Sequence, residues 1–197
     1  MVAYSDTTPA AALEVRVKEL RAPLSAVSLA VEVRDGLPDR FKRLVDDGGV
    51  LHLRVQAELW ESRPVWDRLV YPAIVRVFRF TRAPNNGLSI ADASGAATIY
   101  ATPPRSMPVA LELGDSGRLT PADRYYVHVI ATLGTLAERE VDEVGDAVFG
   151  RESEANGLGS LGRLVFRTVL QVSDYLQSVS AEARGRRTAG VDILKAP

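Results

Sequence analysis

The chain has 197 residues, and its 24 Lys and Arg against 25 Asp and Glu give a formal net charge of −1. A nearly neutral chain has no overall field that would attract nucleic acid or an anionic membrane surface, so neither partner is expected. The absence of cysteine excludes disulfides, thiolate nucleophiles and cysteine-ligated metal centres. A chain of this length can form one domain with a well-buried core.

After residues 1–12, which we expect to be a disordered leader, apolar and polar residues alternate with the period of two that indicates half-buried strands. The pattern predicts two strands with a short connection over residues 13–34, then a short helix over residues 39–45. A long strand follows, from Val50 to about Glu61. Its two faces carry Leu51, Leu53, Val55, Ala57 and Leu59 on one side and His52, Arg54, Gln56, Glu58 and Trp60 on the other.

Further short alternating segments recur from residue 73 to residue 135, separated by turns rich in proline, glycine and asparagine. Helices that could cross between parallel strands are too few for a parallel sheet. We therefore predict a mainly β fold over residues 13–149, an antiparallel β-sandwich of about seven to nine strands with one short crossover helix.

The C-terminal part of the sequence changes character. Residues 150–160 are rich in glycine, serine and asparagine and are expected to be a flexible connector. Apolar residues then recur at spacings of three and four, which predicts a long amphipathic helix over residues 161–185 and a disordered tail over residues 186–197. The apolar face of such a helix needs a cover, for which we expect its own sheet or a homologous chain rather than a membrane.

A bend rich in aromatic residues and arginine follows the long strand. Aromatic and arginine side chains are enriched where proteins bind one another. The candidate contact residues, in the bend and on the adjoining exposed sheet face, are Trp60, Arg63, Trp66, Tyr71 and Arg76. The alternative is that the tryptophans cover the end of the core, with arginines stacked on them.

A second candidate site depends on the two histidines. His52 and His128 fall on the polar faces of predicted strands and could approach each other if those strands were neighbours. With Arg54 and a nearby carboxylate they could line the pocket of a small hydrolase or a ligand-binding fold. Two histidines are an incomplete metal site, and no G-x-S-x-G nucleophile motif is present. No catalytic residue, metal or cofactor is therefore assigned.

The sequence resembles a family of uncharacterised exported proteins of bacteria, the DUF4390 domain family, over about residues 13–145. The resemblance is carried by Leu37-Pro38-Asp39-Arg40-Phe41, Gly48-Gly49-Val50, LHLRVQAELWESRPVWDRLV, VRVFRF and the stretch from Asp123 to Val129. It implies a periplasmic or envelope-associated domain and supplies no catalytic residues. The first ten residues contain no signal-peptide pattern, so this location requires a signal upstream of this numbering, and a cytoplasmic one is expected otherwise.

Together these observations favour a non-enzymatic module that binds a protein partner or a second copy of itself. The expected contact surface is the bend together with the exposed face of the sheet. The sequence identifies neither the partner nor any small-molecule ligand.

Overall fold

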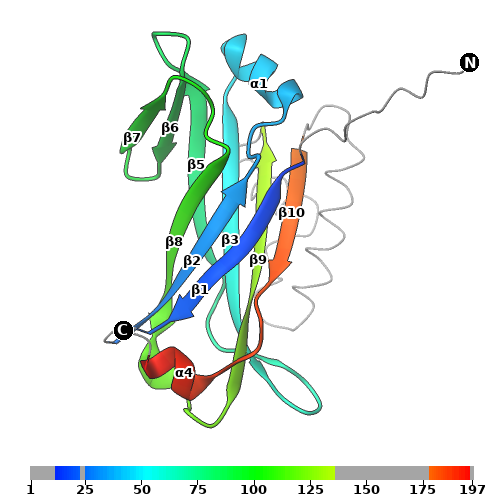
Figure 1. The fold of residues 1–197 in the computed structure, drawn as a ribbon, viewed down its shortest axis with the longest axis vertical. Coiled ribbons are helices and arrows are strands. Elements are labelled where there is room, and N and C mark those ends of the chain that lie inside the picture. Colours follow the sequence, from blue (N-terminus) through cyan, green and yellow to red (C-terminus); the bar gives the residue numbers. More distant parts are fainter. Residues whose placement is uncertain (1–11, 23–24, 136–177, 196–197) are drawn as a thin grey trace, which may run out of the picture.

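The computed structural model describes residues 12–22, 25–135 and 178–195. The fold is mainly β and consists of two antiparallel sheets (Figure 1), as predicted. The first sheet has the order β1-β2-β8 and contains β1 (Glu14–Arg21), β2 (Ala26–Arg34) and β8 (Ser106–Asp115).

The second sheet has eight strands, with the order β10-β9-β3-β5-β6-β7. Its members are β3 (Leu51–Ser62), β5 (Ile74–Arg82), β6 (Leu88–Asp92), β7 (Ala97–Tyr100), β9 (Arg124–Gly134) and β10 (Ser178–Arg184), together with β4 (Arg68–Leu69) on β3 and β11 (Thr188–Ala189) on β9. The described chain thus has eleven strands rather than seven to nine, and two of them are only two residues long.

The core lies between the inner faces of both sheets, whose buried side chains form one hydrophobic cluster. Strand β3 alternates between buried and half-buried residues along its whole length, which confirms the predicted division of its two faces. Leu51, Leu53 and Val55 are completely buried. Burial of such side chains, at about 25 cal/mol per Å² of apolar surface, holds the two sheets together.

Helix α1 (Asp39–Asp46) confirms the predicted short helix and covers one end of the core through Phe41 and Val45, which are 0% and 2% exposed. The helix ends at Asp46, and Gly48, two residues later, has a φ of 90° that favours glycine. Two short helical turns complete the described chain, η1 (Ser116–Arg118) and α4 (Gly190–Lys195). None of the described helices is long and apolar enough to cross a membrane.

The predictions for the C-terminal end are wrong where the structure describes it. Residues 178–184 form strand β10 on β9, not the end of a helix. The predicted helix placed only Val179 of this segment on its apolar face. In the strand, Val179, Ala181 and Ala183 alternate with other residues, and all three pack against the core. Residues 188–195 form β11 and α4 rather than a disordered tail.

The other predicted boundaries are only partly described. Residues 1–11, 136–149, the connector at 150–160 and the first part of the predicted helix, 161–177, lie outside the described residues. Within the bend that follows the long strand, Arg68–Leu69 forms the short strand β4, which pairs with β3.

Candidate functional site

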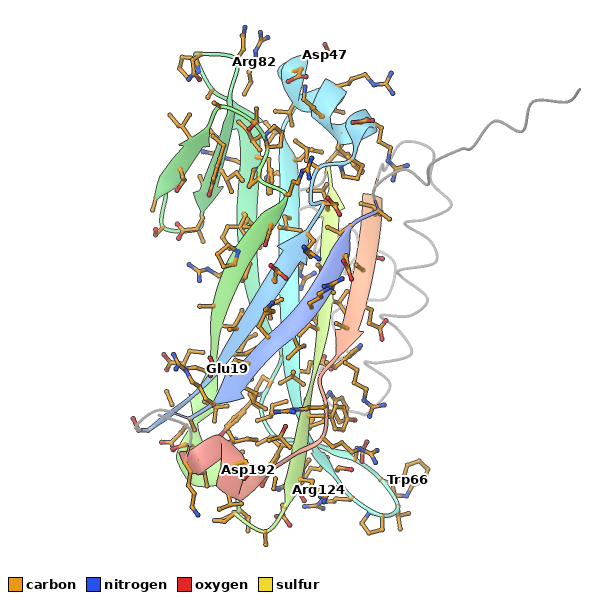
Figure 2. All side chains as sticks on the ribbon, viewed as in Figure 1. Glu19, Asp47, Trp66, Arg82, Arg124 and Asp192 are labelled. Atoms are coloured by element: carbon orange, nitrogen blue, oxygen red, sulfur yellow. The ribbon has the colours of Figure 1, made fainter. Side chains whose placement is uncertain are left out.

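The loop between β3 and β4 carries the most exposed large apolar side chains of the described chain. Val65 is 77% and Trp66 82% exposed. Pro64 lacks a backbone donor and so cannot continue the ladder of β3. Figure 2 shows Trp66 at the tip of this loop, at the end of the molecule opposite to Asp47 of the α1 region.

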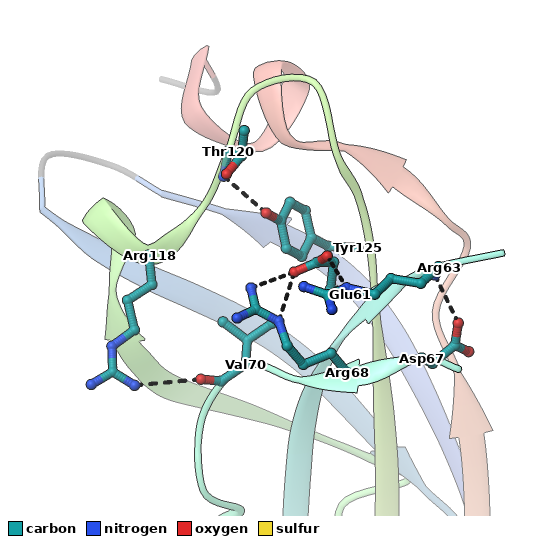
Figure 3. Close-up of polar contacts among 8 residues, drawn as sticks. All are labelled: Glu61, Arg63, Asp67, Arg68, Val70, Arg118, Thr120 and Tyr125. Atoms are coloured by element: carbon teal, nitrogen blue, oxygen red, sulfur yellow. Dashed lines mark hydrogen bonds and ion pairs between the residues drawn. The ribbon is translucent and has the colours of Figure 1, made fainter. Parts of the chain in front are cut away.

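A buried carboxylate holds the base of this loop (Figure 3). Glu61 is only 4% exposed and is the one buried charged residue in the described part of the chain. Its Oε1 accepts a hydrogen bond of 2.5 Å from Arg63 Nε, and its Oε2 accepts bonds of 2.9 and 2.5 Å from Nε and Nη2 of Arg68. The bond from Arg63, then those from Arg68, lower the pKa of Glu61 against the opposing effect of burial.

Asp67 fixes the other side of the loop. It accepts a bond of 3.1 Å from the backbone N–H of Arg63 and one of 2.7 Å from the hydroxyl of Tyr126 on β9. The guanidinium of Arg184 lies 3.9 Å from the centre of the Tyr126 ring and 3.4 Å from Asp67 Oδ2. The hydroxyl bond from Tyr126 is the main cause of the lowered pKa of Asp67. The loop is therefore braced against β3, β9 and β10.

Sequence reasoning missed Glu61 as the residue that organises this loop. The signal was available, because continuing the alternation of β3 beyond Leu59 turns Glu61 toward the core. A carboxylate in that position needs a cationic partner, and arginines occur close by in the sequence at positions 63 and 68.

The structure separates the predicted contact residues. Trp60 lies half-buried on the outer face of β3, beside the base of the loop, and its Nε1 donates a bond of 3.1 Å to Glu58. Arg63 and Trp66 belong to the loop itself. Tyr71, in contrast, is only 6% exposed, and its hydroxyl donates to the backbone carbonyl of Asp115. Tyr71 is therefore a core residue.

Arg76 lies elsewhere on the second sheet. It pairs with Val55 in β3, which places it about 20 Å along the strand from Glu61 at 3.3 Å per residue. Its guanidinium donates a bond of 2.8 Å to the carbonyl of Ala110 on β8 and lies 3.4 Å from Asp92. It also lines a shallow hollow of about 290 Å³. Arg76 links the two sheets and does not belong to the loop surface.

The two histidines do not share a pocket. Strands β3 and β9 are neighbours, as the second candidate site requires, but His52 lies opposite Gly134 and His128 lies opposite Glu58. This register puts the imidazoles about 20 Å apart along the sheet. Arg54, opposite Thr132, lies near His52 and far from His128. Among the described residues, no three histidine, aspartate or glutamate side chains form a group that could hold a metal ion.

His128 instead joins three strands of the second sheet. Its Nε2 lies 2.7 Å from Glu182 Oε1 on β10, and its Nδ1 lies 3.8 Å from Glu58 Oε2 on β3. The carboxylate of Glu58, followed by that of Glu182, raises the pKa of His128, while partial burial opposes the shift. The residue of β10 that lies opposite His128 in the strand register is the cationic Arg184.

This arrangement predicts a pH-dependent contribution to stability. Because the pKa of His128 is raised above its ordinary value of 6.5 on folding, the protonated imidazole stabilises the fold fully below that pH, and this contribution disappears as pH rises through the folded pKa. We expect the free energy of unfolding of the wild type to fall, relative to that of His128→Gln, as pH rises above about 6.5. Urea titrations at several pH values measure it, and parallel curves for the two proteins would contradict the prediction.

Comparison with known proteins assigns no family. No protein-family model, no curated protein and no solved structure matches the chain.

Proposed function

We propose that the protein is a non-enzymatic interaction module that binds another protein through the tip of the β3–β4 loop. The observation that carries the proposal is the exposure of Val65 and Trp66, 77% and 82%, on a loop whose base is held by the buried Glu61. Tryptophan supplies a large contact area and is enriched among the residues that dominate binding energies.

The bracing of the loop supports the same proposal. A contact surface that is already ordered loses less conformational entropy on binding than a mobile one. Glu61 and Asp67 tie the loop to β3 and β9 through ion pairs and a tyrosine hydroxyl. These bonds hold the two sides of the loop, on either side of Val65 and Trp66.

Two further proposals accompany this function. The shared core of the two sheets supports a β-sandwich as the architecture that presents the loop. The resemblance to the DUF4390 family supports an envelope-associated or periplasmic location. Fractionation of cells that express the native gene, with an antibody to the protein, tests the location, and recovery in the cytoplasmic fraction alone would exclude it.

A photo-crosslinking amino acid at position 65, which leaves Trp66 in place, tests the contact surface. In cells that express the native gene, we expect this protein to form a covalent adduct with one partner, identified by mass spectrometry. Val50, which is 40% exposed and precedes β3 at the other end of the strand, provides the matched control position. Adding Trp66→Ala to the variant that carries the crosslinker at position 65 should reduce capture of the same partner at least about tenfold. Equal adducts from positions 50 and 65 would contradict the proposal.

A further inference from the structure

The two arginines at the base of the loop share a single carboxylate (Figure 3). Glu61 binds Nε of Arg63 and both Nε and Nη2 of Arg68. No described residue accepts a hydrogen bond from the terminal nitrogens of Arg63 or from Nη1 of Arg68. Their side chains are 46% and 52% exposed. Two half-exposed guanidinium groups therefore share one carboxylate as their acceptor and keep donors for which the described chain supplies no acceptor.

Further arginines surround this pair. Arg124 lies opposite Ser62, the last residue of β3. Arg184 and Arg187 lie 3.9 and 5.9 Å from the centre of the Tyr126 ring, next to Asp67. Four arginines and three carboxylates interact directly with one another at the loop: Arg63, Arg68, Arg184 and Arg187 with Glu61, Asp67 and Asp123. This group carries one excess positive charge, although the chain as a whole carries a net charge of −1.

We infer that the partner contributes an acidic segment that carries a bulky apolar side chain among its carboxylates. This inference rests on the proposed function of the loop. A carboxylate can bind the free donors of a guanidinium in a bidentate manner, which is the geometry that arginine favours. Glu61 holds both guanidinium groups in place, so less side-chain entropy is lost when the partner binds. The apolar side chain packs against Val65 and Trp66.

The same observations favour an acidic protein over an anionic membrane. A membrane surface attracts a protein through its summed charge, by about 1 kcal/mol for each basic residue near the surface. Here the neighbouring carboxylates reduce that attraction. The fixed guanidinium groups suit a partner whose carboxylates also have fixed positions.

Selection from a phage-displayed library of random peptides tests the inference on the full chain. We expect enriched peptides to combine several Asp or Glu residues with an aromatic or aliphatic residue, and to bind several-fold more weakly at high salt. Trp66→Ala should weaken binding of the enriched peptides at least about tenfold. Arg63→Gln with Arg68→Gln should weaken it by a similar factor.

Matched variants distinguish three causes of weaker peptide binding: loss of positive charge, loss of the planar donor geometry, and unfolding of the protein. Arg63→Lys with Arg68→Lys keeps the charge but removes the planar donors, so an intermediate loss is expected. Adding Glu61→Gln to the two glutamine substitutions leaves no unpaired buried carboxylate, and this triple variant remains a test if the double variant unfolds. Arg43→Gln, on the exposed surface of α1, should leave binding unchanged.

Each remaining outcome decides against one proposal. Enriched peptides that require Trp66 but contain no acidic residues, or that bind the triple variant equally well, would overturn the acidic partner and leave the proposed function standing. If binding of every peptide is independent of Trp66, the proposed function fails as well.

A variant with one tryptophan tests a membrane as the alternative occupant. In Trp60→Phe, Trp66 is the only tryptophan. A blue shift of its fluorescence with vesicles of phosphatidylcholine and phosphatidylserine in equal amounts, and no peptide binding, would identify a membrane as the occupant and overturn the inference.

Discussion

Replacement of Tyr71 by alanine is expected to lower the free energy of unfolding by about 3–5 kcal/mol, the range for a large aromatic side chain removed from a core. Tyr71 is only 6% exposed, and a Cβ atom at Gly114 would lie 2.7 Å from its ring, so the ring packs directly on β8. The guanidinium of Arg118 lies 5.5 Å from the centre of the ring. Urea denaturation followed by circular dichroism measures the loss.

Two other variants provide the controls for this prediction. Tyr71→Phe removes only the hydroxyl bond to Asp115 and should cost about 1 kcal/mol. Trp66→Ala should change stability by less than about 0.5 kcal/mol, because its side chain is 82% exposed. Similar stabilities for Tyr71→Ala and Trp66→Ala would contradict the division between a core aromatic residue and a contact aromatic residue.

Replacement of Ile193 by alanine is expected to cost about 2–5 kcal/mol, although the residue lies close to the C-terminal end of the chain. Ile193 is 0% exposed within α4, and its carbonyl accepts a hydrogen bond of 2.9 Å from Ala22 at the end of β1. At roughly 2–4 °C for each kcal/mol, the melting temperature should fall by several degrees or more. Differential scanning calorimetry measures the change.

Asp192, the exposed neighbour of Ile193 in α4, supplies the control. Asp192→Ala should leave the melting temperature almost unchanged, since substitutions of exposed side chains usually alter stability by less than about 0.5 kcal/mol. A disordered tail would make both substitutions neutral, and that result would contradict the docking of α4.

Much of the fold could be predicted because it depends on local patterns. The alternation from Leu51 to Leu59 reflects the requirement that one face of a strand leave water while the other stays in contact with it. The helix Asp39–Asp46 follows from helical spacing and the glycines after it. The positive φ of Asn86, 60°, agrees with the turn predicted between β5 and β6.

The candidate site could be predicted only in part. The accumulation of arginine and tryptophan after β3 located the loop, and Trp66 is the exposed residue that a contact surface needs. The same composition could not separate Trp66 from Tyr71, because an aromatic side chain suits a core and an interface equally well. Only the packing of Tyr71 against Gly114 distinguishes the two.

By itself the sequence determined where strands alternate, where α1 begins and ends, and which chemistry is excluded by the absence of cysteine, because each of these depends on neighbouring residues or on composition. The tertiary structure decided the register that pairs His128 with Glu58 rather than bringing it near His52, and the strand conformation of Ser178–Arg184. Both depend on contacts between residues far apart in the chain, which no local pattern encodes. The burial of Glu61 between two arginines depends on both the local pattern and the tertiary structure. The alternation of β3 turns its side chain inward, and the pairing of β4 with β3 supplies Arg68.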